Sequence, residues 1–340
     1  MKLLVTGGAG FIGANFVNYV LTNRKDYQVV VCDKLTYAGD MERLRDWIND
    51  PRLKFYKVDI TDRNSLDEIF SREKIGSIIH FAAESHVDRS IQDATPFIDT
   101  NIKGTQVLLD LALKHNIERF IHISTDEVYG ELGHEGRFSE NMPLNPSSPY
   151  SASKAAADLL IKSYIRTHKL PAIIIRPCNN YGPWQYPEKF IPVIIYKAIK
   201  NEKIPVYGQG QNIREWLYVE DCCNGIMEIF EKGKIGEIYN LGSGEERKNI
   251  EVVKTILQTI NKPESLIEFV SDRPGHDFRY SLDSKKVQKE LGWTPSHHFP
   301  EGIEKTIHWN LVNREWIERK IQFLKELWEK VYRRQIKKRN

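Results

Sequence analysis

Cysteine is scarce in this sequence, and the cysteines present lack the spacing of a metal site. Four occur in 340 residues, and none of them forms a C-x-x-C pair. No cluster of histidines has ligand spacing either, so the pattern predicts no bound metal. We expect the four, Cys32, Cys178, Cys222 and Cys223, to behave as small buried hydrophobic side chains.

Long apolar runs are also missing. The sequence holds no stretch of 18 apolar residues, so no transmembrane helix is expected. The N-terminus, MKLLVTGGAGFIG, is broken by glycines too early to form the apolar core of a signal peptide. We therefore expect a cytoplasmic protein that does not bind a membrane.

Excess positive charge is confined to one end of the chain. The net charge is +3, yet residues 311–340 alone carry ten Lys or Arg against four Glu, which leaves the body slightly acidic. This distribution argues against a nucleic-acid-binding body. Apolar side chains recur at roughly helical spacing in residues 313–340, so we predict a basic amphipathic helix that packs on the body or on a partner subunit. A membrane-surface or nucleic-acid role for this tail is the less favoured alternative.

The first half of the chain alternates apolar runs with amphipathic stretches. Continuous Val, Ile and Leu runs between helices predict a parallel sheet covered on both faces, a Rossmann-type doubly wound α/β fold. After about Arg176, glycine and proline become frequent, which indicates a smaller mixed α/β lobe that binds the substrate. We predict a nucleotide-binding domain over 1–176, to which some later segments return, the smaller lobe over 177–312, and the tail over 313–340. The expected strands are 2–6, 29–33, 53–59, 77–83, 119–124 and 172–177, with helices from about Phe11 and over 64–74 and 100–115.

The segment TGGAGFIG places Gly7, Gly10 and Gly13 between the first strand and a helix. Glycines at this spacing allow a tight turn and let the backbone approach a pyrophosphate at the helix N-terminus. Asp33 ends the next strand, about twenty residues past the last glycine, where an acid binds the adenosine ribose diol and disfavours a 2′-phosphate. The pattern favours NAD over NADP, although Lys34 could soften the preference.

A second motif, YSASK, places Tyr150 and Lys154 on one face of a helix. An ammonium beside a phenol favours the phenolate and lowers its pKa, so Tyr150 can take a proton from a substrate hydroxyl while hydride leaves the carbon. Thr125 is positioned to hydrogen-bond the same oxygen. Two adjacent acids, Asp126 and Glu127, follow it at the end of a buried strand.

Together these motifs resemble the extended short-chain dehydrogenase/reductase family, over residues 1 to about 312. Within it the chain is similar to the dTDP-glucose 4,6-dehydratases. The matching segments are HFAAESHVDRS (80–90), STDEVYG (124–130), SPYSASK (148–154), NNYGP and PEKFIP (179–192), REWLYVED (214–221) and DRPGHD (272–277).

The resemblance implies a reaction that explains the acid pair. In such enzymes hydride passes from sugar carbon 4 to NAD+, water is lost across carbons 5 and 6, and the hydride returns to carbon 6. Elimination needs a base at carbon 5 and an acid at the carbon 6 hydroxyl, and two carboxyl groups with pKa values pushed apart meet that need. By resemblance Asp126 is the acid and Glu127 the base, although sequence order alone leaves their division of labour open. The family usually supplies deoxysugars such as rhamnose for surface polysaccharide.

The resemblance also carries over the binding residues and a homodimer, whose interface helices would lie near 100–115 and 151–168. The catalytic set is Thr125, Asp126, Glu127, Tyr150 and Lys154. The cofactor set is Gly7, Gly10, Phe11, Ile12, Gly13, Asp33, Lys34, Thr36, Asp59, Ile60, Phe81, Ala82, Ala83, Thr100, Tyr150, Lys154 and Asn180. The dTDP-glucose set is Ser85, Thr125, Asn179, Lys189, Phe190, Pro205, Val206, Tyr207, Arg214, Asn249, Asp272, Arg273 and His276.

Three alternatives remain at this point. UDP-glucose 4,6-dehydration would use the same catalytic residues and differ only in the nucleobase pocket. A nucleotide-sugar 4-epimerase shares the glycines and the Tyr-Lys pair, but epimerases generally lack the acid pair. A non-catalytic NAD-binding regulator would need none of the residues from Thr125 to Lys154 that are present here.

Overall fold

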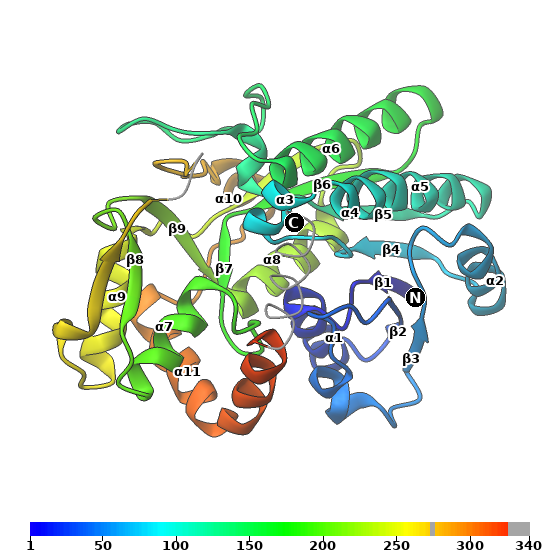
Figure 1. The fold of residues 1–340 in the computed structure, drawn as a ribbon. Coiled ribbons are helices and arrows are strands. Elements are labelled where there is room, and N and C mark those ends of the chain that lie inside the picture. The colour runs from blue at the N-terminus through cyan, green and yellow to red at the C-terminus, as the bar shows by residue number, and fades with distance from the viewer. Residues whose placement is uncertain (273–275, 326–340) are drawn as a thin grey trace, which may run out of the picture.

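A seven-stranded parallel sheet forms the centre of the larger lobe (Figure 1). The computed structural model describes residues 1–272 and 276–325. From edge to edge the strands are β10 (Ile238–Leu241), β6 (Ala172–Pro177), β5 (Arg119–Ile123), β4 (Ser77–His80), β1 (Lys2–Thr6), β2 (Gln28–Asp33) and β3 (Leu53–Lys57).

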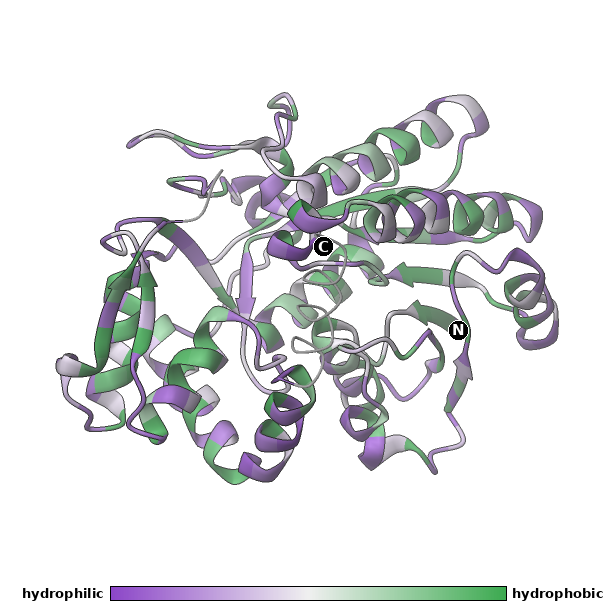
Figure 2. Cartoon of the chain, in the orientation of Figure 1, coloured by the Kyte–Doolittle hydropathy of each residue, from purple (hydrophilic) through white to green (hydrophobic). Residues whose placement is uncertain are grey.

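Helices cover both faces of this sheet, which is why its strands are continuous apolar runs. Leu3 and Val5 of β1 pack in one apolar cluster and Leu4 packs in the other, because successive side chains point to opposite faces. Figure 2 shows the strands as mainly hydrophobic and the helices as striped. One face is covered by α1 (Phe11–Asn23), α8 (Val219–Lys232) and α10 (Lys285–Leu291), the other by α2 (Arg63–Glu73), α5 (Thr105–Lys114) and α6 (Pro149–His168).

The smaller lobe has its own apolar core and two short sheets. Its core joins Ile191, Trp216, Val253 and Phe299 with their neighbours. Of its strands, β11 (Glu246–Lys248), β9 (Ile213–Tyr218) and β7 (Asn179–Tyr181) form one sheet, and β12 (Ile267–Val270) and β8 (Ile204–Tyr207) the other; its helices are α7 (Phe190–Ile199), α9 (Asn249–Thr259) and α11 (Phe299–Val312).

Short elements connect these layers. The predicted helix over 100–115 begins as a π-helical segment. From this segment Asn101 bonds the backbone N–H and C=O of Glu84 (2.9 and 3.0 Å) and the Ser153 hydroxyl (2.8 Å). The predicted strand at 77–83 ends early, at His80. The remaining elements are η1 (Met41–Trp47), α3 (Val87–Gln92), α4 (Thr95–Phe97), η2 (Ile98–Gly104), η3 (Asp126–Tyr129) and η4 (Glu264–Leu266).

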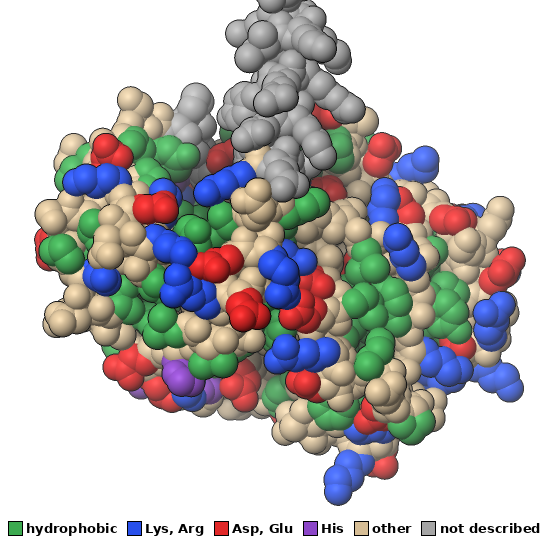
Figure 3. All heavy atoms as spheres, turned by 60° about the horizontal axis from the view of Figure 1, so that its bottom comes forward, with side chains coloured by type: hydrophobic (Ala, Val, Ile, Leu, Met, Phe, Trp, Pro, Cys, Tyr) green, Lys and Arg blue, Asp and Glu red, His purple; other side chains and the backbone are tan. Residues whose placement is uncertain are grey.

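The cysteines, the membrane helices and the metal-ligand groups can each be checked in the described residues. The four cysteines are buried free thiols, as predicted. Within residues 1–272 and 276–325, no helix is long and apolar enough to cross a bilayer, and no three His, Cys, Asp or Glu side chains are grouped to hold a metal. Figure 3 shows one face of the molecule, on which basic and acidic side chains are intermixed.

A helix over residues 314–325 follows α11 and packs back on the body. Trp316 is 2% exposed and lies edge-on to Trp184 with the ring centroids 5.4 Å apart. Its indole Nε1 donates to Asp40 (2.7 Å), and Lys320 forms an ion pair with the same carboxylate (2.7 Å). The described part of the predicted tail therefore packs on the body of its own chain; residues 326–340 lie outside the described residues.

Trp316→Ala is expected to lower the free energy of unfolding by about 3–5 kcal/mol, because it removes a large buried side chain and leaves a cavity. Chemical denaturation measures this. Phe323→Ala on the same helix is the matched control, since Phe323 is 45% exposed and exposed substitutions usually change stability by less than about 0.5 kcal/mol. Equal losses in the two variants would contradict the packing described here.

Candidate active site

A cleft of about 340 Å³ lies along the carboxyl ends of the sheet strands. The strand order reverses between β1 and β4: β2 and β3 follow on the side of β1, and β5, β6 and β10 follow on the side of β4. This reversal opens a crevice beside the strand ends, which is where doubly wound sheets bind their ligands. All seventeen residues of the predicted cofactor set line this cleft, as do Ser85, Thr125, Asn179 and Lys189 of the predicted substrate set.

The glycine turn after β1 is closed by backbone contacts that exclude side chains. Gly7 has φ +70°, and a Cβ placed there would lie 2.6 Å from the backbone nitrogen of Ala82. A Cβ on Gly13 would lie 2.3 Å from the carbonyl oxygen of Gly7. Among the described residues, no side chain caps the following helix α1 and no acid lies in its first turn. Its N-terminal amides are therefore suited to bind an anionic group.

Asp33 ends β2 at the same edge of the cleft. Its two carboxylate oxygens accept from the backbone N–H groups of Ala9 (3.0 Å) and Leu35 (2.8 Å), and a carboxylate has further lone pairs for a diol. Burial raises the pKa of Asp33, while these two bonds lower it. Lys34 forms an ion pair with Asp59 (2.5 Å), so its charge is neutralised by an acid within the cleft.

Buried polar atoms in the cleft wall indicate that the cavity fits a polar ligand. Asn179 Oδ1, Gln185 Oε1 and the Tyr186 hydroxyl are buried without a hydrogen-bond partner among the described residues, and all three residues line the cleft. Buried polar groups are normally bonded to protein, water or ligand. The glycine turn, the amide-rich helix end, Asp33 and these atoms together fit a dinucleotide such as NAD.

Asp126 and Glu127 lie in η3, directly after β5, and not in the strand itself. Thr125 caps this short helix: its hydroxyl accepts from the Glu127 N–H (3.3 Å) and donates to Asp126 Oδ1 (3.2 Å). Asp126 is 2% exposed. Burial, followed by the nearby charges of Glu127 and Glu215, raises the pKa of Asp126 well above its usual range. The raised pKa favours the protonated form of Asp126, which is the form that a general acid needs.

Tyr150 and Lys154 lie in the first turns of α6, whose start is fixed by a capping box between Ser148 and Ser151. Burial raises the pKa of Tyr150, the charge of Glu127 raises it further, and a hydrogen bond with Thr125 lowers it.

Lys154 lies one turn after Tyr150 on this helix, and its amine contacts the sheet. The Lys154 ammonium donates to the carbonyl oxygen of Ile123 (2.7 Å) and lies 3.4 Å from His122 Nε2. The Ile123 carbonyl, at the end of β5, therefore holds the Lys154 amine against the sheet. Burial lowers the pKa of Lys154 to about 8.

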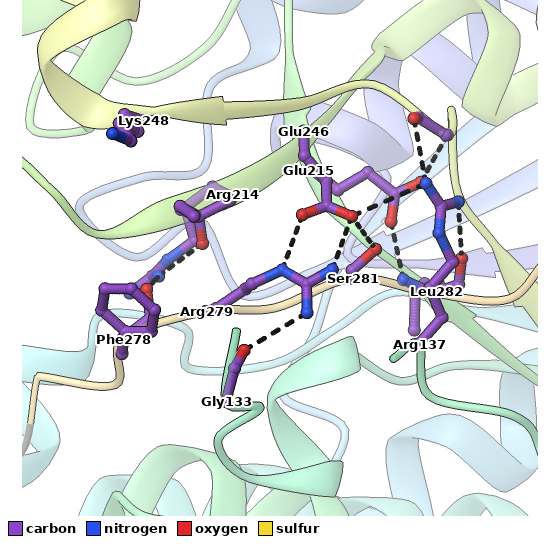
Figure 4. Close-up of polar contacts among 12 residues, drawn as sticks. Gly133, Arg137, Arg214, Glu215, Glu246, Lys248, Phe278, Arg279, Ser281 and Leu282 are labelled. Atoms are coloured by element: carbon purple, nitrogen blue, oxygen red, sulfur yellow. Dashed lines mark hydrogen bonds and ion pairs between the residues drawn. The ribbon is translucent and has the colours of Figure 1, made fainter. Parts of the chain in front are cut away.

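Several predicted substrate residues lie outside the cleft, in the smaller lobe. Arg214 of β9 donates to the carbonyl oxygens of Ile213 (2.8 Å) and Asp277 (2.9 Å) and stacks on Tyr280. Figure 4 shows it beside an ion-pair cluster in which both nitrogens of the Arg279 fork reach Glu246 (2.7 and 2.8 Å).

The proposed nucleobase segment is strand β8, in which only alternate side chains are accessible. Pro205 and Tyr207 are exposed, whereas Val206 points into the core of the lobe. The Val206 side chain turns inward because side chains alternate along a strand, and the assignment of Val206 to the substrate set stays a prediction.

The other predicted substrate residues are distributed around this lobe. Tyr207 lies edge-on to His276 (6.0 Å), and His276 contacts Asp272 (2.7 Å). Phe190 begins α7 and stacks on Trp216, and Asn249 begins α9. Arg273 lies outside the described residues.

Sequence reasoning missed part of the cleft wall. Arg43 is buried, and its guanidinium donates to the carbonyl oxygens of Ala9 (2.7 Å), Ala38 (2.5 Å) and Trp184 (3.0 Å). It lies in no motif, so its sequence gives no signal of this role. The other unpredicted lining residues are Cys32, Ala38, Gly39, Val58, Glu84, Ile123, Ser124, Pro177, Cys178, Gln185, Tyr186 and Glu188.

A glycine turn at the sheet's switch point, an acid after β2 and a Tyr-x-x-x-Lys helix facing the same cleft define an extended short-chain dehydrogenase/reductase. The model of the GDP-mannose 4,6 dehydratase family matches residues 4–306. The chain belongs to this family of nucleotide-sugar 4,6-dehydratases, and within it to the dTDP-glucose 4,6-dehydratases.

Named relatives cover nearly the whole chain. Low-salt glycan biosynthesis protein Agl12 of Haloferax volcanii is 51% identical, over 93% of this chain and 100% of its own. The dTDP-glucose 4,6-dehydratase of Escherichia coli is 48% identical, over 94% and 96%. A crystal structure of the dTDP-glucose 4,6-dehydratase DesIV of Streptomyces venezuelae, with NAD and dTDP bound, has a TM-score of 0.91 at 45% identity and covers 94% of this chain and 100% of its own.

Proposed function

We propose that the protein converts dTDP-glucose to dTDP-4-keto-6-deoxyglucose, as a hydro-lyase that uses NAD+ and returns it unchanged. The observation that carries the proposal is the pair Asp126 and Glu127, which lies beside Tyr150 in a cleft shaped for a dinucleotide. Oxidation alone needs Tyr150, whereas loss of water needs an acid and a base as well. The named dTDP-glucose 4,6-dehydratases at 46–48% identity support the same reaction.

The residues of the cleft divide the work by position and protonation. NAD+ supplies the acceptor and later the donor of the hydride. The hydroxyls of Thr125 and Tyr150, which interact with each other, bind the oxygen on carbon 4, and the deprotonated form of Tyr150 takes its proton. Asp126, whose raised pKa favours its protonated form, gives a proton to the departing carbon 6 hydroxyl. Glu127, which is less buried, removes the proton from carbon 5.

Cofactor binding would use the described groups of the cleft. The amides at the start of α1 face the pyrophosphate, and Asp33 accepts from the adenosine ribose hydroxyls. Lys34 is paired with Asp59, which disfavours its use as a partner for a 2′-phosphate.

Replacing Asp33 by alanine is expected to weaken NAD+ binding by about tenfold or more, because a charge-assisted hydrogen bond is worth about 1.5–3 kcal/mol. Affinity for NADP+ should fall much less, since the acid repels its extra phosphate. Equilibrium titration of protein freed of cofactor measures both constants. Asp62→Ala, an exposed helix-cap acid, is the control. A proportional loss for both cofactors would contradict the role of Asp33.

We further propose a cytoplasmic homodimer joined through α5 and α6. These helices lie side by side on one face of the large lobe (Figure 1), and Leu159 of α6 and Ile98 of η2 are exposed apolar side chains in this region. All four cysteines are free, which suits a compartment that keeps thiols reduced. Light scattering in solution distinguishes a dimer from a monomer.

The deciding assay incubates the protein with dTDP-glucose and, separately, with UDP-glucose. A 4-keto-6-deoxy sugar is read from its absorbance in alkali and from the loss of one water by mass spectrometry. We expect product from dTDP-glucose and much less from UDP-glucose. No product from either sugar would refute the proposed function, and a 4-epimer of unchanged mass would identify an epimerase.

A further inference from the structure

Behind the catalytic side chains lies a buried network of polar side chains. Its central residue is Arg176, whose side chain is only 1% exposed. Neither Arg176 nor its ion-pair partner Asp158 lines the cleft, so neither contacts a ligand there. The question is what a fully buried ion pair does next to an active site.

Arg176 contacts two elements that each carry part of the chemistry. Its Nε donates to Asp158 Oδ2 (2.9 Å), and Asp158 lies one turn after Lys154 on α6, the helix of Tyr150. One of its terminal nitrogens donates to the Tyr129 hydroxyl (2.8 Å), and Tyr129 ends η3, the turn that carries Asp126 and Glu127. A single guanidinium thus joins the hydride-transfer helix to the elimination turn.

Both ends of this connection are fixed by further contacts. The Tyr129 hydroxyl donates to Asn240 Oδ1 (2.8 Å), so it is both an acceptor and a donor. Its ring stacks on Phe138 at 4.9 Å, and Arg176 lies over its face at 4.7 Å. Asn240 is the strand neighbour of Arg176 across β10 and β6. The Tyr129 ring is therefore held from the sheet and from both of its faces.

The opposite end reaches the catalytic lysine. Asp158 lies 3.7 Å from His122 Nε2, which in turn lies 3.4 Å from the Lys154 ammonium. Burial keeps the pKa of His122 well below its ordinary value, so a neutral imidazole separates the Lys154 and Arg176 cations.

A contribution to folding stability is a poor explanation for this buried network of polar side chains. Exchanging a buried ion pair for apolar side chains of similar volume is often neutral or stabilising, because burying two charges costs solvation. What a planar guanidinium that donates to two partners, Asp158 and Tyr129, provides is fixed geometry. In catalysis, a shift of about 1 Å in a reacting group can cost about 100-fold in rate.

We infer that Arg176, with Tyr129 and Asp158, is a positioning residue that holds the acid pair in register with Tyr150 and Lys154, so that both act on one bound sugar. This inference rests on the proposed function. Disturbing these contacts should slow elimination relative to oxidation, because η3 has only four residues whereas α6 is a helix of twenty residues.

The test uses Tyr129→Phe, which removes one hydroxyl and leaves the Arg176–Asp158 pair intact. Single-turnover reactions with dTDP-glucose are quenched over time, and the substrate, the 4-keto sugar that still holds its water, and the dehydrated product are quantified by mass spectrometry. We expect near-normal formation of the 4-keto sugar and at least about tenfold slower loss of water. The undehydrated intermediate should therefore accumulate.

The matched control is Tyr239→Phe. Tyr239 is the buried neighbour of Asn240 on β10. The variant loses the hydrogen bonds of its hydroxyl with Lys234 N–H (3.1 Å) and Glu290 (3.0 Å), and neither partner belongs to a catalytic element. It should lose comparable stability while both steps keep their relative rates.

The inference would be overturned if Tyr129→Phe left the ratio of oxidation to water loss unchanged, or if it slowed both steps equally. Wild-type protein in the same experiment separates this claim from the proposed function. If the wild type makes the dehydrated product and the variant partitions normally, only the positioning role fails. If the wild type makes no dehydrated product, the proposed function itself fails.

Discussion

Tyr150→Phe is expected to slow oxidation at carbon 4 by about 10²–10⁴-fold, the usual contribution of a positioned proton acceptor. The phenol faces the cleft, bonds Thr125 and adjoins Glu127, and phenylalanine keeps its shape without its proton chemistry. Quenched single turnovers of dTDP-glucose measure the step directly. All later products should fall in parallel, because elimination needs the ketone.

Tyr164→Phe serves as the control for that experiment. Tyr164 lies on the same helix, and its hydroxyl donates to Asp110 (2.6 Å), away from the cleft. Its loss should leave oxidation at the wild-type rate. An oxidation rate in Tyr150→Phe equal to that of Tyr164→Phe would remove Tyr150 from the mechanism.

Asp126→Asn should allow oxidation but slow the loss of water by about 10²–10⁴-fold. An amide fills the same space and cannot deliver a proton to the leaving hydroxide. The 4-keto sugar that still carries its carbon 6 hydroxyl should accumulate and be seen by mass spectrometry. Glu135→Gln, an exposed acid on the loop after η3, should change neither step. Normal elimination in Asp126→Asn would transfer the role of acid to another group.

The raised pKa of Asp126 also gives this step a pH dependence with a definite sign. The acid works only while protonated, so the elimination rate should be highest below that pKa and should fall as pH rises through it. Oxidation should follow the opposite trend, because burial raises the pKa of Tyr150 and its basic form becomes more populated as pH rises. An elimination rate that increases with pH would contradict the assignment of Asp126 as the acid.

The sequence was most informative where local patterns and backbone geometry coincide. Buried parallel strands read as uninterrupted apolar runs because helices cover both faces, and the expected strand 172–177 is β6 as it stands. Glycines 7 and 13 could be predicted because no Cβ fits at these positions. Asp33 and Thr125 follow strands of one parallel sheet, and the carboxyl ends of such strands meet at one edge.

What the sequence left open depends on contacts between distant segments. The amine of Lys154 donates to the carbonyl oxygen of Ile123, a contact that no spacing rule indicates. Arg43 contributes to the cleft wall through carbonyl groups of three separate loops. The raised pKa of Asp126 depends on burial, then on Glu127 and then on Glu215, which lies nearly ninety positions further along the chain. Adjacency in sequence alone therefore could not assign acid and base.

The central claim is that one hydride leaves carbon 4 and returns to carbon 6 after water has been lost. dTDP-glucose carrying deuterium at carbon 4 tests it most directly, with the product analysed by mass spectrometry and NMR. The account predicts a product lighter by one water that carries the deuterium on carbon 6. Deuterium found in the solvent, or at carbon 4 of a sugar of unchanged mass, would contradict it.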